Sequence, residues 1–157
     1  MVDKRDIGSI ISASLYFYEL FKKTILATPF AEAATKTQMD IMLVLYANGP
    51  MSMSALSSRA SIAPEQATRA IKNLRERGLV ESDRDEENRR LVIARLSERG
   101  VLALDDHMRQ LHANLQASLT GLDDKGVAQL AETARTATQL MEKTGFRHMI
   151  VDPKARK

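Results

Sequence analysis

Residues 64–100, PEQATRAIKNLRERGLVESDRDEENRRLVIARLSERG, decide the fold of this chain. Pro64 suits the first position of a helix, where its missing N–H costs nothing, and Gly78 is a typical helix end. Between them, apolar residues repeat at helical spacing on one face: Ala67, Ala70, Ile71 and Leu74. Two short strands follow, at 79–82 and 91–96, and the polar stretch 83–90 joins them as a hairpin. The stretch therefore predicts a helix followed by a β-hairpin.

The residues before this stretch predict two more helices and a short strand. A helix over 37–47 begins at Thr37, which can cap it with Asp40 three positions later. Residues 51–53 alternate like a strand, and 54–60 predict a short helix. A short helix, a tight connection, a second helix and a hairpin make a winged helix-turn-helix. We therefore expect a mainly α fold with a small β-hairpin, in which residues 37–97 form the winged helix-turn-helix domain.

Both ends of the chain predict longer helices with apolar stripes. The first helix spans 5–27, and its stripe includes Ile7, Ile11, Leu15 and Tyr18. A helix from Ser97 carries a seam that steps by three and four residues: Val101, Leu104, Met108, Leu111, Leu115 and Leu119. A last helix begins at Asp123 and ends at Gly145, and the basic tail 151–157 is expected to be mobile. The stripes are too apolar to face water, so they predict either core packing or contact with another subunit.

Length and composition exclude several classes of protein. The 157 residues suffice for one domain, and an aromatic content of 4% is low for a β-sandwich or barrel. The absence of cysteine rules out disulfides, thiolate zinc sites and thiol-based oxidation sensors. No apolar stretch is long enough to span a bilayer and the first residues lack the order of a signal peptide, so we expect a cytoplasmic protein without a membrane partner.

The second helix of the predicted helix-turn-helix carries polar and basic residues on its exposed side. Gln66 and Asn73 have amides that can pair with adenine, and Arg69 can pair with guanine, each through two hydrogen bonds. Thr68 and Lys72 suit phosphate groups. This pattern favours a helix that enters the major groove of double-stranded DNA, and the alternative is an ordinary solvated face.

The predicted hairpin loop, 83-DRDEENRR-90, places arginines beside carboxylates. Arg89 or Arg90 at its tip would suit a minor groove, where the negative potential is strong. The alternative is a loop that pairs with itself, because its four acids outnumber its three arginines. Acids near phosphates cost energy unless they point away or hold the arginine side chains in position.

These motifs resemble the MarR family of bacterial transcription regulators. The resemblance runs through 56-LSSRA-60, residues 64–77, 78-GLVE-81, 88-NRR-90 and 91-LVIARLSERG-100. It implies a homodimer in which residues 1–36 and 98–150 form the helical dimerisation region and each winged domain faces one half-site of a pseudo-palindromic operator. It also implies that 64–77 is the recognition helix and that Arg90 enters the minor groove. Most such proteins are repressors, and many release DNA when a small aromatic or anionic ligand binds.

Three positions depart from the family pattern. Asn88 stands where the family commonly has an aspartate that orients the wing arginines. Ser82 stands where a basic residue is common, and Arg84 is the nearest basic residue that could replace it. Ala63 stands where a capping Asp or Ser is common, which would weaken the start of the recognition helix by about 1 kcal/mol.

The resemblance implies a ligand site among the first, second and fifth main helices. Its candidate lining residues in this chain are Tyr16, Phe17, Met42, Tyr46 and His107. Each also fits a plainer role, which is core packing for Tyr16, Phe17 and Met42 and a solvated face for His107.

Other functions have less support in the sequence. It contains no phosphate-binding glycine loop, nucleophile elbow or metal-binding helix motif, so we expect neither an enzyme nor a cofactor. His107 and His112 are five residues apart, a poor spacing for sharing a metal on a helix. Two alternatives to a ligand-released repressor stay open: a constitutive DNA-binding protein without a ligand switch, and a winged domain that binds another protein.

Overall fold

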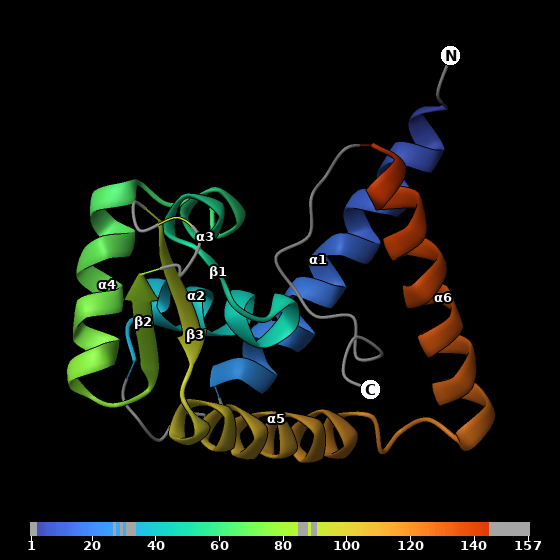
Figure 1. The fold of residues 1–157 in the computed structure, drawn as a ribbon. Helices are drawn as coiled ribbons and strands as arrows, with labels where there is room; N and C mark the ends of the chain where they lie inside the picture. Colours follow the sequence, from blue (N-terminus) through green and yellow to red (C-terminus); the bar gives the residue numbers. More distant parts are fainter. Residues whose placement is uncertain are drawn as a thin grey trace.

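The computed structural model describes residues 3–26, 28, 30, 34–84, 88 and 91–144. Within these residues the elements are α1 (Lys4–Leu26), α2 (Lys36–Asn48), β1 (Met51–Ser52), α3 (Met53–Arg59), α4 (Pro64–Glu76), β2 (Val80–Arg84), β3 (Val92–Leu96), α5 (Glu98–Ser118) and α6 (Asp124–Lys143). This order confirms a mainly α fold with a small β-hairpin. Figure 1 shows α4 and the hairpin at one end of the molecule, α6 at the other, and α5 running between them.

The hairpin belongs to a three-stranded antiparallel sheet with the order β1-β3-β2. Val80 pairs with Leu96 at the base of the hairpin, and Arg84 pairs with Val92 toward its tip. Met51 of β1 pairs with Ala94, so the short strand predicted before the helix-turn-helix lies on the free edge of β3. The sheet therefore ties the hairpin to the segment between α2 and α3.

Polar caps fix where most helices begin. Ser52, Ser97 and Asp123 each accept a hydrogen bond from a backbone N–H in the first turn of α3, α5 and α6. The prediction that Thr37 caps α2 is wrong: Thr35 is the cap, and Gln38 completes a capping box with it. The box satisfies two backbone N–H groups reciprocally, which an aspartate three residues after Thr37 does not offer.

The helix α4 has a different start and end. It begins at Pro64 with Ala63 as its N-cap, and no side chain caps it, as the sequence predicted. It ends where Gly78 adopts a left-handed φ of 68°, which glycine tolerates without a steric cost. The chain then turns directly into β2, so α4 and the hairpin are joined without a linker.

A single apolar core holds the winged domain together. Its largest fully buried side chains come from α2, α3, α4, the start of the hairpin and α5: Ile41, Met42, Val44, Leu56, Leu74, Leu79 and Leu104. The predicted inner face of α4 is confirmed, because Ala67, Ala70, Ile71 and Leu74 are all buried. This packing leaves the opposite face of α4 on the surface.

The apolar stripes of α1 and α6 do not enter this core. Large side chains of α1 are exposed: Ile7, Ile10, Ile11, Leu15, Tyr16, Tyr18 and Phe21. On α6 no residue is buried, and Val127, Leu140 and Met141 are exposed. Of the two explanations of the stripes, core packing within one chain is therefore wrong for these residues.

Candidate nucleic-acid interface

The outer face of α4 is polar and accessible. The five residues predicted there, Gln66, Thr68, Arg69, Lys72 and Asn73, are all exposed. Arg75 and Arg77 add positive charge near the end of the helix, against Glu65 and Glu76. In Figure 1, α4 forms the edge of the molecule, with the hairpin beside it. A helix at the edge of the molecule, with its polar face accessible, can enter a DNA groove.

Two of these side chains also bond to their own helix. The Thr68 hydroxyl donates to the Pro64 carbonyl at 2.9 Å, so its free lone pairs face outward as acceptors. Arg69 Nε donates to the Glu65 carbonyl at 3.3 Å, which leaves the terminal guanidinium nitrogens available as donors. In this conformation Arg69 is better suited than Thr68 to bind a phosphate or a guanine edge.

Asn73 has a partner that the sequence analysis missed. Gln38 Nε2 donates to Asn73 Oδ1 at 2.8 Å and links the N-terminus of α2 to the exposed face of α4. Arg77 Nη1 donates to Gln38 Oε1 at 3.3 Å. Gln38 is 9% exposed, so it supports the surface from beneath. The capping box pattern of Thr35 and Gln38 was the available sequence signal for its position.

Arg95 on β3 is a second residue that the sequence did not single out, and it links the two strands of the wing. Its Nε donates to Glu81 at 2.9 Å and its Nη2 donates to Asp83 at 2.6 Å. Hydrogen bonds from the guanidinium to Glu81 and Asp83 raise the pKa of Arg95 above its usual range. One positive charge on β3 therefore pairs with two of the wing's carboxylates and halves their net negative charge.

The structure places only part of the predicted wing contacts. Arg84 is exposed at the end of β2, and Asn88 is exposed, with its carbonyl accepting a hydrogen bond from Leu91 N–H at 2.8 Å. Arg89 and Arg90 lie outside the described residues, and so do the acids at 85–87. The predicted minor-groove contact of Arg89 or Arg90 thus stays a prediction.

The five predicted ligand-site residues do not line one described cavity. Tyr16 is 80% exposed, Phe17 is half-buried on the same helix, and Met42 is fully buried in the core. Tyr46 donates a short hydrogen bond to Asp105 and so joins α2 to α5. The solvated role considered for His107 is wrong, because that side chain is half-buried.

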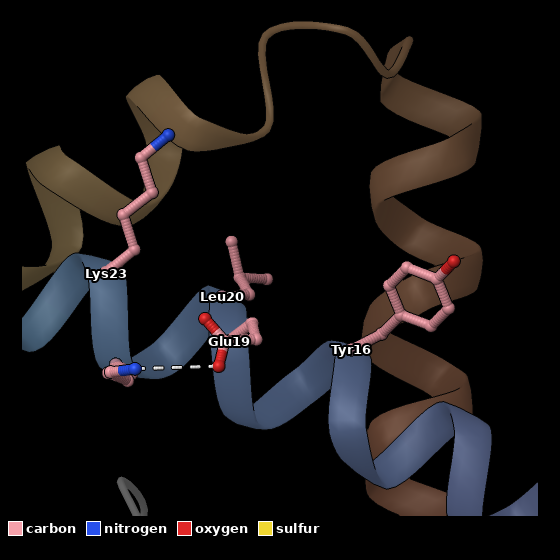
Figure 2. Close-up of a pocket in the computed structure, with 5 residues that line it drawn as sticks. Tyr16, Glu19, Leu20 and Lys23 are labelled. Carbon is pink, nitrogen blue, oxygen red and sulfur yellow. Dashed lines mark ion pairs between the residues drawn. The ribbon is translucent and has the colours of Figure 1, made fainter.

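Of the five candidates, only Tyr16 lines the pocket found on the surface of α1. Tyr16 lines a shallow, open pocket on α1 together with Glu19, Leu20, Lys22 and Lys23 (Figure 2). Lys22 is paired with Glu19 at 3.6 Å, one turn away on the same helix. Such an open surface with one internal ion pair does not enclose a small molecule.

Neither a metal cluster nor a membrane span is found in the part of the chain that the structure describes. Over these residues, no three His, Asp or Glu side chains come together as metal ligands would. None of the described helices has the length and hydropathy required to cross a bilayer.

Comparisons with known proteins agree with this geometry. The model of the MarR family matches residues 34–92. A MarR family protein from Bacillus stearothermophilus has a TM-score of 0.80 and 20% identity, over 90% of this chain and 99% of that one. Streptococcus pneumoniae FabT, solved in complex with DNA, has a TM-score of 0.63 and 20% identity, over 90% and 99%.

A third similar structure concerns ligand control. It describes regulation of DNA binding of Bordetella bronchiseptica BpsR by 6-hydroxynicotinic acid, with a TM-score of 0.58 and 17% identity over 85% of this chain and 98% of that one. A search of curated proteins finds no match. At such identities the structural likeness establishes the fold, while the family match covers the segment from the start of α2 to the start of β3. Residues 34–92 therefore match the MarR family model, and the chain shares the overall fold of these solved structures.

Proposed function

We propose that this chain is a homodimeric transcription regulator that binds a pseudo-palindromic DNA operator and is released from it by a small aromatic or anionic ligand. The observation that carries the proposal is the exposed face of α4, where Gln66, Arg69 and Lys72 lie together opposite the buried stripe. A helix with amide and guanidinium groups on its outer face fits the major groove, because these groups match the base edges there.

The exposed apolar side chains of α1 and α6 support the homodimer. Ile11, Leu15 and Tyr18 on α1 are 55%, 60% and 60% exposed, an unusual degree for residues that share one helix stripe. A second copy of the chain would cover such a surface. A two-fold axis would then give two α4 helices for two half-sites, with centres roughly one helical turn of DNA apart.

The relatives support the two activities separately. FabT, which shares the fold, was solved in complex with DNA. BpsR, which also shares it, has its DNA binding regulated by 6-hydroxynicotinic acid. The alternative is a constitutive DNA-binding protein, and it is favoured by one observation: among the candidate ligand-site residues, Met42 is fully buried in the core whereas Tyr16 is 80% exposed.

Fluorescence anisotropy with labelled duplexes from the region upstream of the chain's own gene tests DNA binding. We expect log affinity to fall linearly with log salt between about 50 and about 200 mM. Arg69→Ala should weaken binding by roughly 1–3 kcal/mol. Arg109→Ala is the matched control, since Arg109 is an exposed arginine of α5 paired with Asp106. Failure of the parent to bind any duplex at low salt would contradict the proposal.

A ligand titration of the same complex separates the two candidate functions. Aromatic acids and phenols are added to the protein–DNA complex, and the release of labelled DNA is followed. Release by one of these classes supports the ligand-controlled regulator. A complex that is indifferent to all of them supports the constitutive alternative.

A further inference from the structure

The side chain of Gln38 has an orientation that its partners fix. Its Oε1 accepts hydrogen bonds from the Thr35 backbone N–H at 3.0 Å and from Arg77 Nη1 at 3.3 Å. Both partners can only donate, because a backbone N–H and a guanidinium carry no acceptor. The atom that faces them must therefore be the amide oxygen of Gln38, and its nitrogen must be the atom that faces Asn73.

The orientation of Asn73 follows from that of Gln38. Gln38 Nε2 is a donor, so the Asn73 atom 2.8 Å from it must be the acceptor Oδ1. Gln38 is almost wholly buried whereas Asn73 is exposed, so the bond turns the oxygen of Asn73 toward α2. The Nδ2 amino group is the end of the side chain that stays available to a ligand.

This arrangement changes what Asn73 can recognise. A two-bond contact with adenine requires asparagine to donate to N7 and accept from N6 with both ends of its amide facing the base. In this chain the accepting end is held by Gln38. On the basis of the proposed DNA-binding function, we infer that Asn73 acts on DNA as a hydrogen-bond donor, oriented by Gln38, and does not read adenine.

The partner of Asn73 is then an acceptor atom on DNA. Two sources supply one: a phosphate oxygen and an acceptor on a base edge, such as N7 of a purine. Along α4, Asn73 lies seven residues after Gln66 and four before Arg77, so the three share the helix edge nearest α2. Gln38 is a positioning residue in this scheme, since it acts on DNA only through Asn73.

Gln38→Glu tests the inference with little effect on the fold. Glutamate also serves in a capping box, so its oxygens can still accept from Thr35 N–H and Arg77. The variant has no amide donor, however, and Asn73 must turn its Nδ2 toward the new carboxylate and its oxygen toward DNA. We expect a roughly tenfold loss of DNA affinity in the anisotropy assay, the size of one charge-assisted hydrogen bond. Urea unfolding should match that of the parent.

Two controls isolate this effect from the added charge. Gln129→Glu introduces the same charge on the exposed surface of α6 and should leave affinity within about twofold of the parent. In an Asn73→Ala background, Gln38→Glu should cost no more than that control, because the residue through which it acts is gone. Equal losses from Gln38→Glu with and without Asn73 would overturn the inference.

A panel of duplexes with each base pair of a half-site replaced in turn identifies the acceptor. An Asn73→Ala loss that is equal on every duplex indicates a phosphate, and a loss shared by adenine and guanine at one position indicates a purine N7. A loss confined to adenine would overturn the inference. If the parent binds DNA and Gln38→Glu binds equally well, the inference is wrong and the proposed function stands. If the parent binds no duplex, the proposed function itself fails and takes the inference with it.

Discussion

Gly100 lies directly against the backbone of Leu79, so closely that a Cβ added at Gly100 would sit 2.0 Å from the Leu79 oxygen. Ser97 secures the same junction, because its N–H donates to the Leu79 carbonyl at 3.1 Å and its hydroxyl donates to the Gly78 carbonyl at 2.6 Å. The first turn of α5 is thus locked to the base of the hairpin. Movement of α5 relative to the winged domain must involve this junction.

Gly100→Ala should therefore destabilise the protein. The neighbouring atoms are backbone, which cannot rotate away, and overpacking of this kind costs roughly 1–3 kcal/mol. The measurement is the free energy of unfolding in urea. Gly121→Ala is the control, since a Cβ there meets nothing within 4 Å and the residue has no left-handed φ. Equal stability of the two variants would contradict the tight contact.

The fold could be predicted largely because its signals are local. Pro64, Gly78 and Asp123 each fix an end of a helix through the conformation or hydrogen bonds of a few neighbouring residues. The start of α2 was misplaced because two threonines could each cap the helix. Thr35 is the cap because the side chain of Gln38 reaches back to the Thr35 N–H, whereas the shorter side chain of Asp40 does not do this for Thr37. The pairing of β1 with β3 joins segments about forty residues apart, and no local pattern predicts it.

Arg95→Gln should weaken DNA binding without breaking the hairpin. Arg95 pairs with Glu81 and Asp83 on β2, and its loss leaves both carboxylates without this positive charge on the wing near the proposed phosphates. We expect a severalfold loss of affinity in the anisotropy assay that shrinks as salt screens the charges. Adding Asp83→Asn to Arg95→Gln should restore part of the loss. A loss that is independent of salt would point instead to a distorted wing.

The candidate site was less predictable than the fold. The exposed positions of α4 follow from helical periodicity, which places Gln66, Arg69 and Lys72 opposite a buried stripe. Periodicity says nothing of the side-chain partners, and the contact of Gln38 with Asn73 spans 35 residues of sequence. The orientation of an exposed amide is set by such distant contacts, so it emerges only from the three-dimensional structure.

His107 should make stability depend on pH. Its ring is edge-on to Phe30, with centroids 5.4 Å apart, and its Nδ1 is buried with no hydrogen-bond partner among the described residues. Burial lowers the pKa of His107 from its ordinary value of 6.5, and the charge of Asp106 opposes this shift. The unfolded chain then binds the proton more readily than the folded chain. The free energy of unfolding therefore has its full value above about pH 6.5 and falls as the pH drops below it.

The measurement is urea unfolding of the parent, His107→Gln and His112→Gln between about pH 7.5 and about pH 5. We expect His107→Gln to lose part of the pH dependence, because the group that titrates differently in the two states is gone. His112→Gln is the control, because it makes the same substitution at an exposed position of the same helix. Identical slopes for all three proteins would show that His107 does not contribute.

Ile11→Glu should dissociate the proposed homodimer. Ile11 is 55% exposed in the single chain and lies in the apolar stripe of α1, so a charge there would be buried in both copies on dimerisation. Loss of roughly 1.5 kcal/mol of burial per copy predicts at least a hundredfold weaker dimer. Sedimentation equilibrium measures it, with Leu91→Glu as control because Leu91 is an exposed apolar residue of the wing. If Ile11→Glu stays dimeric while Leu91→Glu dissociates, the subunits meet through the winged domains and the dimer role proposed for α1 is wrong.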